Sequence, residues 1–491
     1  MSGALTQGER LSAAPILDAV ERYRGVMVDL DKGTTLRPDA FHQGREALTL
    51  QLRQQGLEPG DKVLVALPNG PGFVAMLAAV LACDASPLLL HFKTPTAELQ
   101  RYAMRFGVRF LATEASQAAD CAEIEKVSTS LTFGDEVLHW GQLAIDLDAL
   151  TGPTLRGVPL HPTSGSTGLP KLALRPGFAA MEEARHYAET MQITAEDCIA
   201  AIPPMSHAYG YGMSVMTPLL TGASIVSTSR FSVKLLHQAL LDHPLTIVPS
   251  APAMLELLSY GAGDKFRRLR WLLAAGSMLP RRASEIFREA TGVVVCPLYG
   301  TTETGGISVS TIADGNETDG RVGPAMNGVE VEVWPHPDGE RLGPDIGKLH
   351  VRSSSMMLGY LDDDGNILQP LEDGWFETGD LARLDDDGAI VLRGRNSELI
   401  NVAGLKVTPC EVEEAIAAMP GVKEVKAYAG EHRTGTQIVK VAVAVEGAID
   451  EMAIRQHCVQ QLVYYKRPQQ VTIVDALPRS PTGKILPDQL P

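Results

Sequence analysis

The sequence lacks the features that mark several large classes of protein. It holds 43 lysines and arginines against 59 aspartates and glutamates, a formal net charge of −16, whereas nucleic-acid-binding proteins usually carry a basic face. The first residues show no basic stretch followed by an apolar core, so no secretory signal is expected. The longest apolar run, Phe73–Ala82, is far shorter than the ~18 residues that span a bilayer, and we interpret it as a buried helix.

Paired cysteines and clustered histidines are also missing. The six cysteines lie far apart without a Cys-x-x-Cys pair, which argues against a structural zinc site and favours reduced thiols. With no signal visible, the expected location is the cytoplasm. No internal repeat or low-complexity tract stands out, and 491 residues exceed one compact core, so two or more domains are expected.

What the chain does contain is an alternation of strand-like and helical segments. Lys62–Pro68 and Ser86–Phe92 are predicted strands, and a helix is predicted between them over Phe73–Cys83. The pattern returns with a helix-like Tyr211–Leu220 and the runs "SIVSTS", "LTIVPS", "LRWLLAAG" and "GVVVCPLYG". Strand–helix–strand alternation predicts parallel sheets with crossover helices, which is an α/β fold.

The pattern changes after about residue 320, where "GVEVEVWP", "GKLHVRSSS" and "GAIVLRGR" are separated by Asp/Gly turns. These short alternating strands predict a smaller antiparallel piece within the large N-terminal domain. The last hundred residues or so read as an independent α+β unit, and the boundary is placed within Arg393–Ile400. We therefore expect a domain of residues 1–396 and a small mobile domain of residues 397–491.

The most polar and flexible stretch is "TSGSTGLPK", Thr163 to Lys171. Its glycines allow a ligand to approach the backbone closely, successive N–H groups can converge on an anion, and Lys171 adds one positive charge. Four hydroxyls add donors: those of Thr163, Ser164, Ser166 and Thr167. The combination suits a polyphosphate.

Two better-known loops do not fit this stretch. The spacing of Gly165 and Gly168 is not that of a Walker loop, and neither Ser nor Thr follows Lys171. A nucleophile elbow needs glycine two residues before its serine, where Ser166 has Ser164. The simple alternative is a mobile loop exposed to solvent.

"TSGSTGLPK" resembles the signature loop of the adenylate-forming superfamily, which includes acyl- and aryl-CoA synthetases, the adenylation domains of peptide synthetases, and luciferases. Further motifs of this family follow in order over roughly residues 60 to 491. The resemblance implies a two-step reaction. A carboxylate attacks the α-phosphate of ATP to give acyl-AMP and pyrophosphate, and a thiol then displaces AMP.

The resemblance also implies which residues hold the nucleotide. In "YGTTETG", Thr302 would contact the α-phosphate and Glu303 would help to hold Mg²⁺. Asp380, in "WFETGDLA", would accept hydrogen bonds from the ribose, and Arg395 would reach ribose or phosphate. The segments that border the nucleotide include Tyr299, Gly300, Thr301 and Gly276.

The acid is expected to bind beside "PPMSHAYGYG", where His207 would border the carboxylate as a further catalytic residue. The predicted pocket consists of His207, Tyr209, Gly210, Ser250, Ala251, Ala275 and Gly276. Small and aromatic residues without an evident charged selector favour an aryl acid or a short to medium acyl chain.

In the C-terminal unit, Lys484 of "PRSPTGKI" resembles the family's catalytic lysine, and Gly404 resembles the glycine that lines the thiol tunnel. Two positions depart from the family pattern. Ser397 stands at the pivot, where Asp or Lys is usual. Arg175 follows the loop in "PKLALRPG", and it can either meet a phosphate or lie on the surface.

The sequence therefore predicts an AMP-forming carboxylate–CoA ligase that uses ATP, Mg²⁺ and coenzyme A. Within the family, the acceptor can instead be a carrier-protein phosphopantetheine or an amine. From other classes, a phosphotransferase that releases ADP and a non-catalytic nucleotide-binding relative stay open. The expected partners are a small carboxylic acid and CoA or a carrier protein, with neither nucleic acid nor a membrane span; the oligomeric state is open.

Overall fold

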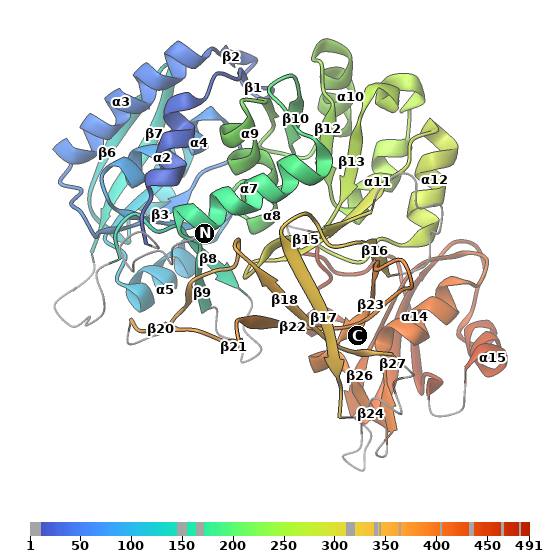
Figure 1. The fold of residues 1–491 in the computed structure, drawn as a ribbon. Helices are drawn as coiled ribbons and strands as arrows, with labels where there is room; N and C mark the ends of the chain where they lie inside the picture. The colour runs from blue at the N-terminus through green and yellow to red at the C-terminus, as the bar shows by residue number, and fades with distance from the viewer. Residues whose placement is uncertain are drawn as a thin grey trace.

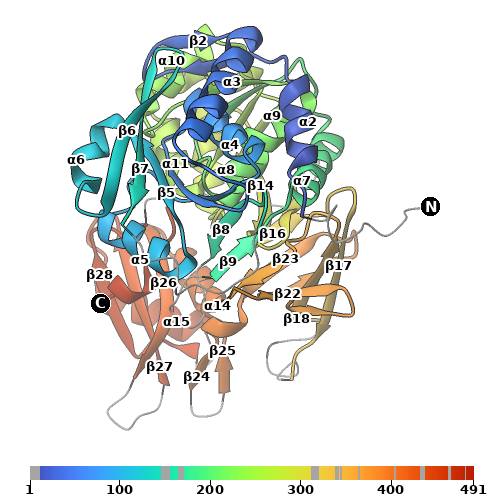
Figure 2. The ribbon, with the colours of Figure 1, turned by 90° about the vertical axis from the view of Figure 1, so that its left-hand side faces the viewer.

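The computed structural model describes residues 11–144, 155–163, 171–310, 320–337, 342, 345–362, 365–402, 405–431, 437–462, 466–480 and 483–491. Two large sheets with their helices form the N-terminal part, shown from blue to yellow-green in Figure 1. An antiparallel sheet and a small α+β unit, orange to red, lie below them in Figures 1 and 2. None of the helices among the described residues is long and apolar enough to cross a membrane.

The first sheet has nine strands and collects segments from distant parts of the chain. Its order is β20 (Ile367–Leu368), β19 (Gly359–Leu361), β9 (Lys171–Leu174), β8 (Leu160–Thr163), β4 (Ser86–Leu89), β3 (Lys62–Ala66), β5 (Phe110–Glu114), β7 (Glu136–Leu143) and β6 (Glu125–Phe133). The central pairs β3–β4 and β3–β5 are parallel, as predicted, while hairpins close both edges.

The second sheet has eight strands. Its order is β15 (Gly305–Val309), β14 (Cys296–Thr301), β13 (Trp271–Ala274), β12 (Ile247–Ser250), β10 (Cys198–Ala201), β11 (Ser224–Ser227), β1 (Met27–Asp29) and β2 (Thr34–Leu36). The strands from β14 to β1 run parallel. Parallel strands covered by helices are buried on both faces, which explains their continuous apolar runs.

The helices of these two layers are α2 (Ala14–Arg22), α3 (Pro38–Gln54), α4 (Pro71–Ala82), α5 (Thr96–Phe106), α6 (Ala118–Cys121), α7 (Gly177–Met191), α8 (Ala208–Tyr211), α9 (Thr217–Thr221), α10 (Val233–Asp242), α11 (Pro252–Ser259) and α12 (Arg281–Thr291). Short turns of 3₁₀ helix add η1 (Ala115–Gln117) and η3 (Gly263–Arg268). The apolar run of α4 is buried in one core that also holds Val63 of the first sheet and Ile225 of the second. The prediction of a buried helix there is confirmed.

The predicted helix over Tyr211–Leu220 is interrupted. Between α8 and α9 the backbone widens into a π-helix, η2 (Gly212–Met216). A one-turn π segment is uncommon and often lies at a functional site.

The predicted antiparallel piece is present as a separate sheet in the order β16 (Arg321–Gly323), β23 (Ile390–Arg395), β22 (Trp375–Leu384), β18 (Gly347–Ser353) and β17 (Val329–Pro335), with β21 (Leu371–Glu372) paired to β22. Two strands from this part of the chain, β19 and β20, belong instead to the first sheet. β19 leaves the antiparallel sheet and pairs with β9 of the first sheet, with Tyr360 opposite Ala173.

The C-terminal unit mixes strands and helices, as expected of an α+β unit: β24 (Ile400–Val402), β25 (Leu405–Val407), α14 (Pro409–Ala417), β26 (Val422–Glu431), β27 (Gln437–Val445), α15 (Glu451–Gln461), β28 (Gln470–Val474) and η7 (Pro487–Gln489). It has its own apolar core. A 3₁₀ turn, η5 (Asn396–Glu398), joins it to β23. The exact boundary at residue 396 stays a prediction.

Candidate nucleotide and carboxylate site

The carboxyl ends of four neighbouring strands carry most of the predicted site. β10, β12, β13 and β14 are adjacent and parallel, so their ends meet at one edge of the second sheet. The segments that follow them hold the predicted residues: His207 after β10, Ser250 and Ala251 at the end of β12, Ala275 and Gly276 after β13, and Thr302 and Glu303 after β14. The structure thus gathers residues separated by a hundred positions in the chain.

The nucleotide loop is the connection of a hairpin. β8 and β9 pair antiparallel, with Thr163 directly opposite Lys171, so the loop leaves and re-enters the sheet at one place. The Lys171 Nζ lies 5.1 Å from the centre of the Tyr360 ring. Residues Ser164, Gly165, Ser166, Thr167 and Gly168 lie outside the described residues, as does Gly404, and their roles stay predictions.

Asp380 links two sheets at the site. It lies on β22 opposite Arg395 of β23, and its Oδ1 is 3.1 Å from the Arg395 Nε. Its Oδ2 accepts a hydrogen bond of 2.5 Å from the hydroxyl of Tyr299 on β14. Burial raises the pKa of Asp380, while Arg395 and the Tyr299 hydroxyl act against that rise. A carboxylate held from two sides is suited to accept hydrogen bonds from a ribose.

Glu303 lies in the turn between β14 and β15. Its Oε1 accepts a hydrogen bond of 2.7 Å from the Tyr360 hydroxyl, and its carbonyl accepts one of 2.6 Å from the Met357 N–H. Tyr360 therefore contacts both Lys171, at the end of the nucleotide loop, and the predicted metal ligand. Sequence reasoning missed Tyr360, because no motif marks the strand β19 that carries it.

Lys484 reaches the same region from the C-terminal unit. The preceding residue, Gly483, lies beside α11, and a methyl group on Gly483 would be 3.9 Å from the Ala251 Cβ. The ammonium interacts electrostatically with Arg395, Glu303 and Asp380. The Lys484 side chain is exposed to solvent, but protein surrounds much of it. Its pKa is lowered, mainly by desolvation and in second place by the positive charge of Arg395.

His207 lies near enough to Lys484 for their charges to interact. Desolvation and then Lys484 and His91 lower the pKa of His207 to about 4, so the ring is neutral near pH 7. The residue is nevertheless exposed, and a side chain that is crowded by protein but open to solvent suits the wall of a binding site. His91, which follows β4, is a second residue that sequence reasoning missed; its ring lies tilted against the Phe92 ring, with 4.7 Å between the ring centres.

The predicted pocket residues differ in what they contact. Ser250 is fully buried, and its hydroxyl donates to the Leu273 carbonyl at 2.6 Å. Its side chain therefore links β12 to the neighbouring strand β13. Gly210 packs against the Pro204 carbonyl, where a Cβ atom would approach to 2.1 Å. Gly276 needs its glycine for a φ of +91°. Tyr209 is half-buried, and its Oη has no hydrogen-bond partner within the described part of the chain.

Arg175 corrects an expectation. It is fully buried, so it does not lie on the surface, and its two terminal nitrogens contact Glu183 and the Thr302 carbonyl rather than pointing outward to a phosphate.

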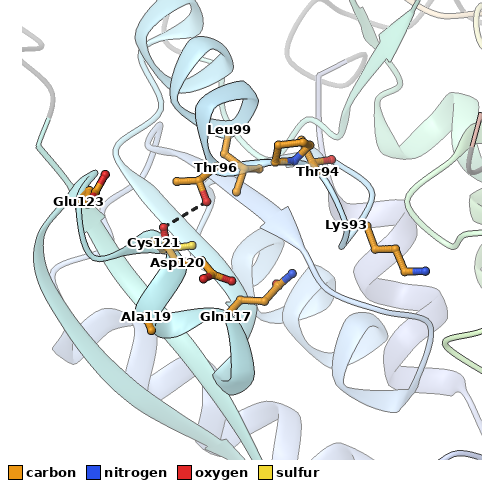
Figure 3. Close-up of a pocket in the computed structure, with 10 residues that line it drawn as sticks. Lys93, Thr94, Thr96, Leu99, Gln117, Ala119, Asp120, Cys121 and Glu123 are labelled. Atoms are coloured by element: carbon orange, nitrogen blue, oxygen red, sulfur yellow. Dashed lines mark hydrogen bonds between the residues drawn. The ribbon is translucent and has the colours of Figure 1, made fainter.

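A separate cavity of about 500 Å³ lies between α5 and the η1–α6 turn (Figure 3). It is lined by Lys93, Thr94, Pro95, Thr96, Leu99, Gln117, Ala119, Asp120, Cys121 and Glu123. None of these residues belongs to the predicted site, and the Lys93 side chain extends away from the others (Figure 3).

Beneath the site, His161 of β8 is buried as a neutral ring. It packs edge-on to Tyr211 at 4.6 Å, and neither ring nitrogen has a hydrogen-bond partner among the described residues. Desolvation, then Arg175 and His207, hold its pKa well below the usual value, against a weak backbone contribution from Ser206. Unfolding at mildly acidic pH must therefore add a proton to this ring.

We expect His161 to make the fold less stable as the pH falls below about 6.5, the ordinary pKa of histidine. The unfolded state binds the proton and the folded state does not, so the slope contributed by this ring approaches ~1.4 kcal/mol per pH unit. The variant His161→Phe keeps the ring without its polar atoms and should show a smaller slope. Urea unfolding between pH ~7 and ~5.5 measures how the free energy of unfolding changes with pH in the two proteins. Equal slopes would contradict the expectation.

Two family models match the chain. The model described as AMP-binding enzyme covers residues 28–361, and the model for the AMP-binding enzyme C-terminal domain covers residues 411–484. The chain belongs to the adenylate-forming, AMP-binding enzyme family. This confirms the family suggested by the loop, and an α/β N-terminal part with a small C-terminal domain is the family's architecture.

Individual relatives span nearly the whole chain. A sulfoacetate–CoA ligase from Cupriavidus necator is 28% identical over 484 residues, which cover 93% of each protein. A 3-hydroxybenzoate–CoA ligase from Aromatoleum is 27% identical over 88% of this chain and 87% of the relative. The solved structure of ATP-bound MatB from Rhodopseudomonas palustris superimposes with a TM-score of 0.81 at 22% identity, over 97% of each chain, which supports the fold.

Proposed function

We propose that this chain activates a carboxylic acid with ATP, releases pyrophosphate and transfers the acyl group from acyl-AMP to coenzyme A. The observation that carries the proposal is that Lys484, from the C-terminal unit, lies near enough to Glu303, Asp380 and Arg395 to interact electrostatically with them. Relatives matched over most of the chain bear the names of CoA ligases. The relatives named as CoA ligases, together with structural neighbours that hold ATP and Mg²⁺, support a ligase that uses ATP, Mg²⁺ and CoA.

The main chemical requirement is positive charge, because a carboxylate must approach the α-phosphate, which is itself an anion. The Lys484 ammonium supplies such a charge at the site, and Arg395 supplies a second. Lys171 anchors the end of the loop that would hold the leaving β- and γ-phosphates. His207, neutral near pH 7, can border the acid without adding charge.

The residues present fit a magnesium ion that arrives with the nucleotide. Mg²⁺ in such sites is held by one or two carboxylates together with phosphates and water, and Glu303 offers one carboxylate. Among the described residues, no group of three or more Asp, Glu, His or Cys side chains could form an all-protein metal cage. Bound there, the ion would neutralise phosphate charge.

The function is tested by the products. The purified protein, incubated with MgATP, CoA and a panel of acids, should form AMP and pyrophosphate with its preferred acid, together with an acyl-CoA. The panel includes aryl acids and short to medium acyl acids, because we propose that the pocket around Ala275, Gly276 and Tyr209 takes one of these. Accumulation of ADP would contradict the proposal and favour a phosphotransferase, and nucleotide binding without turnover of any acid would favour a non-catalytic relative.

The acceptor is tested in the same assay. We propose CoA, and parallel reactions with a phosphopantetheinylated carrier protein and with amines would reveal either alternative. We also propose that the reaction takes place in the cytoplasm, a location supported by six free thiols. The division at residue 396, the tunnel role of Gly404 and the pivot role of Ser397 remain part of this proposal.

A further inference from the structure

A buried ion pair lies directly behind the nucleotide site. Arg175 follows strand β9, and Glu183 lies on helix α7; the Arg175 Nη2 is 2.8 Å from the Glu183 Oε2. Both side chains are 1% exposed, so each charge is almost completely removed from water. Such pairs are often no more stable than an apolar pair of the same volume, so stability alone does not account for this one.

Each partner makes a second contact, one to the turn between β14 and β15 and the other to the start of β15. Arg175 Nη1 donates to the Thr302 carbonyl at 2.9 Å. Glu183 Oε1 accepts from the Gly306 N–H at 3.1 Å. The pair therefore holds the β14–β15 hairpin at two points, one on each side of Glu303.

Two glycines, Gly212 and Gly305, leave the space that the Glu183 carboxylate occupies. A Cβ atom on Gly212, the first residue of the π-helix, would lie 2.4 Å from the Glu183 Oε1. A Cβ atom on Gly305 would lie 2.7 Å from the Glu183 Cδ, and Gly305 also has a φ of +76°. Any other residue at either position would displace Glu183 or the turn.

We propose that Arg175 and Glu183 are positioning residues that fix Thr302 and Glu303 relative to the nucleotide loop. The inference rests on the proposed function, in which both segments contact MgATP. Arg175 comes four residues after Lys171, the end of that loop, through the short strand β9. A guanidinium suits this task because its planar fork serves two acceptors at once in a fixed geometry, which an ammonium does not.

The decisive variant is the double substitution Arg175→Met with Glu183→Gln. It removes both charges together, and glutamine still offers an acceptor to the Gly306 N–H, so no buried charge is left alone. The donor to the Thr302 carbonyl is lost. We expect kcat/KM for MgATP to fall about ten- to a hundred-fold, because small misplacement of catalytic groups has effects of this size. We also expect the Mg²⁺ concentration for half-maximal activity to rise.

A control ion pair lies in the second sheet, at the amino ends of strands β10 and β13, opposite the strand ends that carry the site. Arg270 precedes β13 and contacts both carboxylate oxygens of Asp197 at 2.6 Å, and Asp197 precedes β10. The double variant Asp197→Asn with Arg270→Met removes an ion pair whose carboxylate is buried and whose arginine is 40% exposed, far from the strand ends that carry the site. It should affect thermal unfolding without changing the kinetics or the Mg²⁺ requirement. The single variant Arg175→Lys keeps the positive charge but loses the planar fork. It should therefore retain more of the wild-type stability than of the wild-type kcat/KM.

MgATP binding, measured by calorimetry on each folded variant, separates this inference from the proposed function. If the wild-type protein forms AMP and the Arg175/Glu183 double variant matches it in kcat/KM, Mg²⁺ requirement and MgATP affinity, the positioning role is wrong. Equal kinetic losses in the Asp197/Arg270 control would also overturn it, because the effect would then be one of general stability. If the wild-type protein forms no AMP with any acid, the proposed function fails, while weaker MgATP binding in the double variant would still support the positioning role.

Discussion

Replacing Lys484 with methionine is expected to slow the formation of acyl-AMP by a factor on the order of 10²–10³, or about 3–4 kcal/mol, the usual effect of losing one preorganised donor. Methionine keeps much of the side-chain length and removes the charge. The ammonium interacts with Glu303, Asp380 and Arg395, so its loss removes positive charge from the place where the phosphate and the acid meet. Isotope exchange between pyrophosphate and ATP, driven by the preferred acid, measures this half-reaction.

The second half-reaction provides the internal control. Thioester formation from supplied acyl-AMP should be much less affected, since the lysine is not needed once pyrophosphate has left. Lys440→Met, on β27 of the same unit, should leave both steps unchanged; the Lys440 ammonium contacts the Pro491 carbonyl at 2.7 Å. Near wild-type exchange in the Lys484 variant would refute the assignment. Because its pKa is lowered, Lys484 should lose its proton, and adenylation its rate, at a lower pH than an ordinary lysine would.

Glu303→Gln is expected to reduce adenylation by about 10²-fold, or ~2.7 kcal/mol, and to raise the Mg²⁺ concentration needed for half-maximal rate. The amide keeps the size of the side chain, but a neutral oxygen is a poorer ligand for a hard cation. Initial rates of pyrophosphate release measured over a range of Mg²⁺ concentrations at saturating ATP reveal both changes.

Tyr360→Phe is the matched control for Glu303. It removes only the hydroxyl that donates to the Glu303 Oε1 at 2.7 Å and keeps the ring beside Lys171. Its effect should be several-fold smaller than that of Glu303→Gln, because the carboxylate remains. If the Glu303 variant kept its Mg²⁺ requirement unchanged, Glu303 would not be a metal ligand.

Much of the fold could be predicted from local pattern alone. The buried strands β3 and β12 and the buried helix α4 are recognisable in the sequence, because elements covered on both faces have continuous apolar runs. Their parallel direction follows from the chain's alternation of strand and helix, whereas their order in the sheets does not. The structure brings Glu303, Asp380 and Lys484, which the family motifs single out, into one region of the molecule, and their catalytic roles stay predictions.

What the sequence did not show depends on contacts between distant segments. Tyr360 reaches Glu303 only because β19 crosses to the first sheet, a pairing that no turn or periodicity in its neighbourhood predicts. Arg175 looked like a surface or phosphate-binding cation, since a charged side chain is seldom fully buried, and only Glu183 and the Thr302 carbonyl explain its place. His91 belongs to none of the motifs, and only the fold brings it near enough to His207 to affect the pKa of that residue.

The crossing of β19 also limits how this protein can be divided. Residues 359–361 are hydrogen-bonded to β9, next to the nucleotide loop, although the chain before and after them builds the antiparallel sheet. A hybrid enzyme that exchanges everything after residue 320 would give β9 a foreign neighbour and would replace the tyrosine that contacts Lys171 and Glu303. A junction after Arg395 keeps β19 beside β9. Hybrids of natural sequences joined after Arg395 should therefore fold and act, whereas hybrids joined after residue 320 should not.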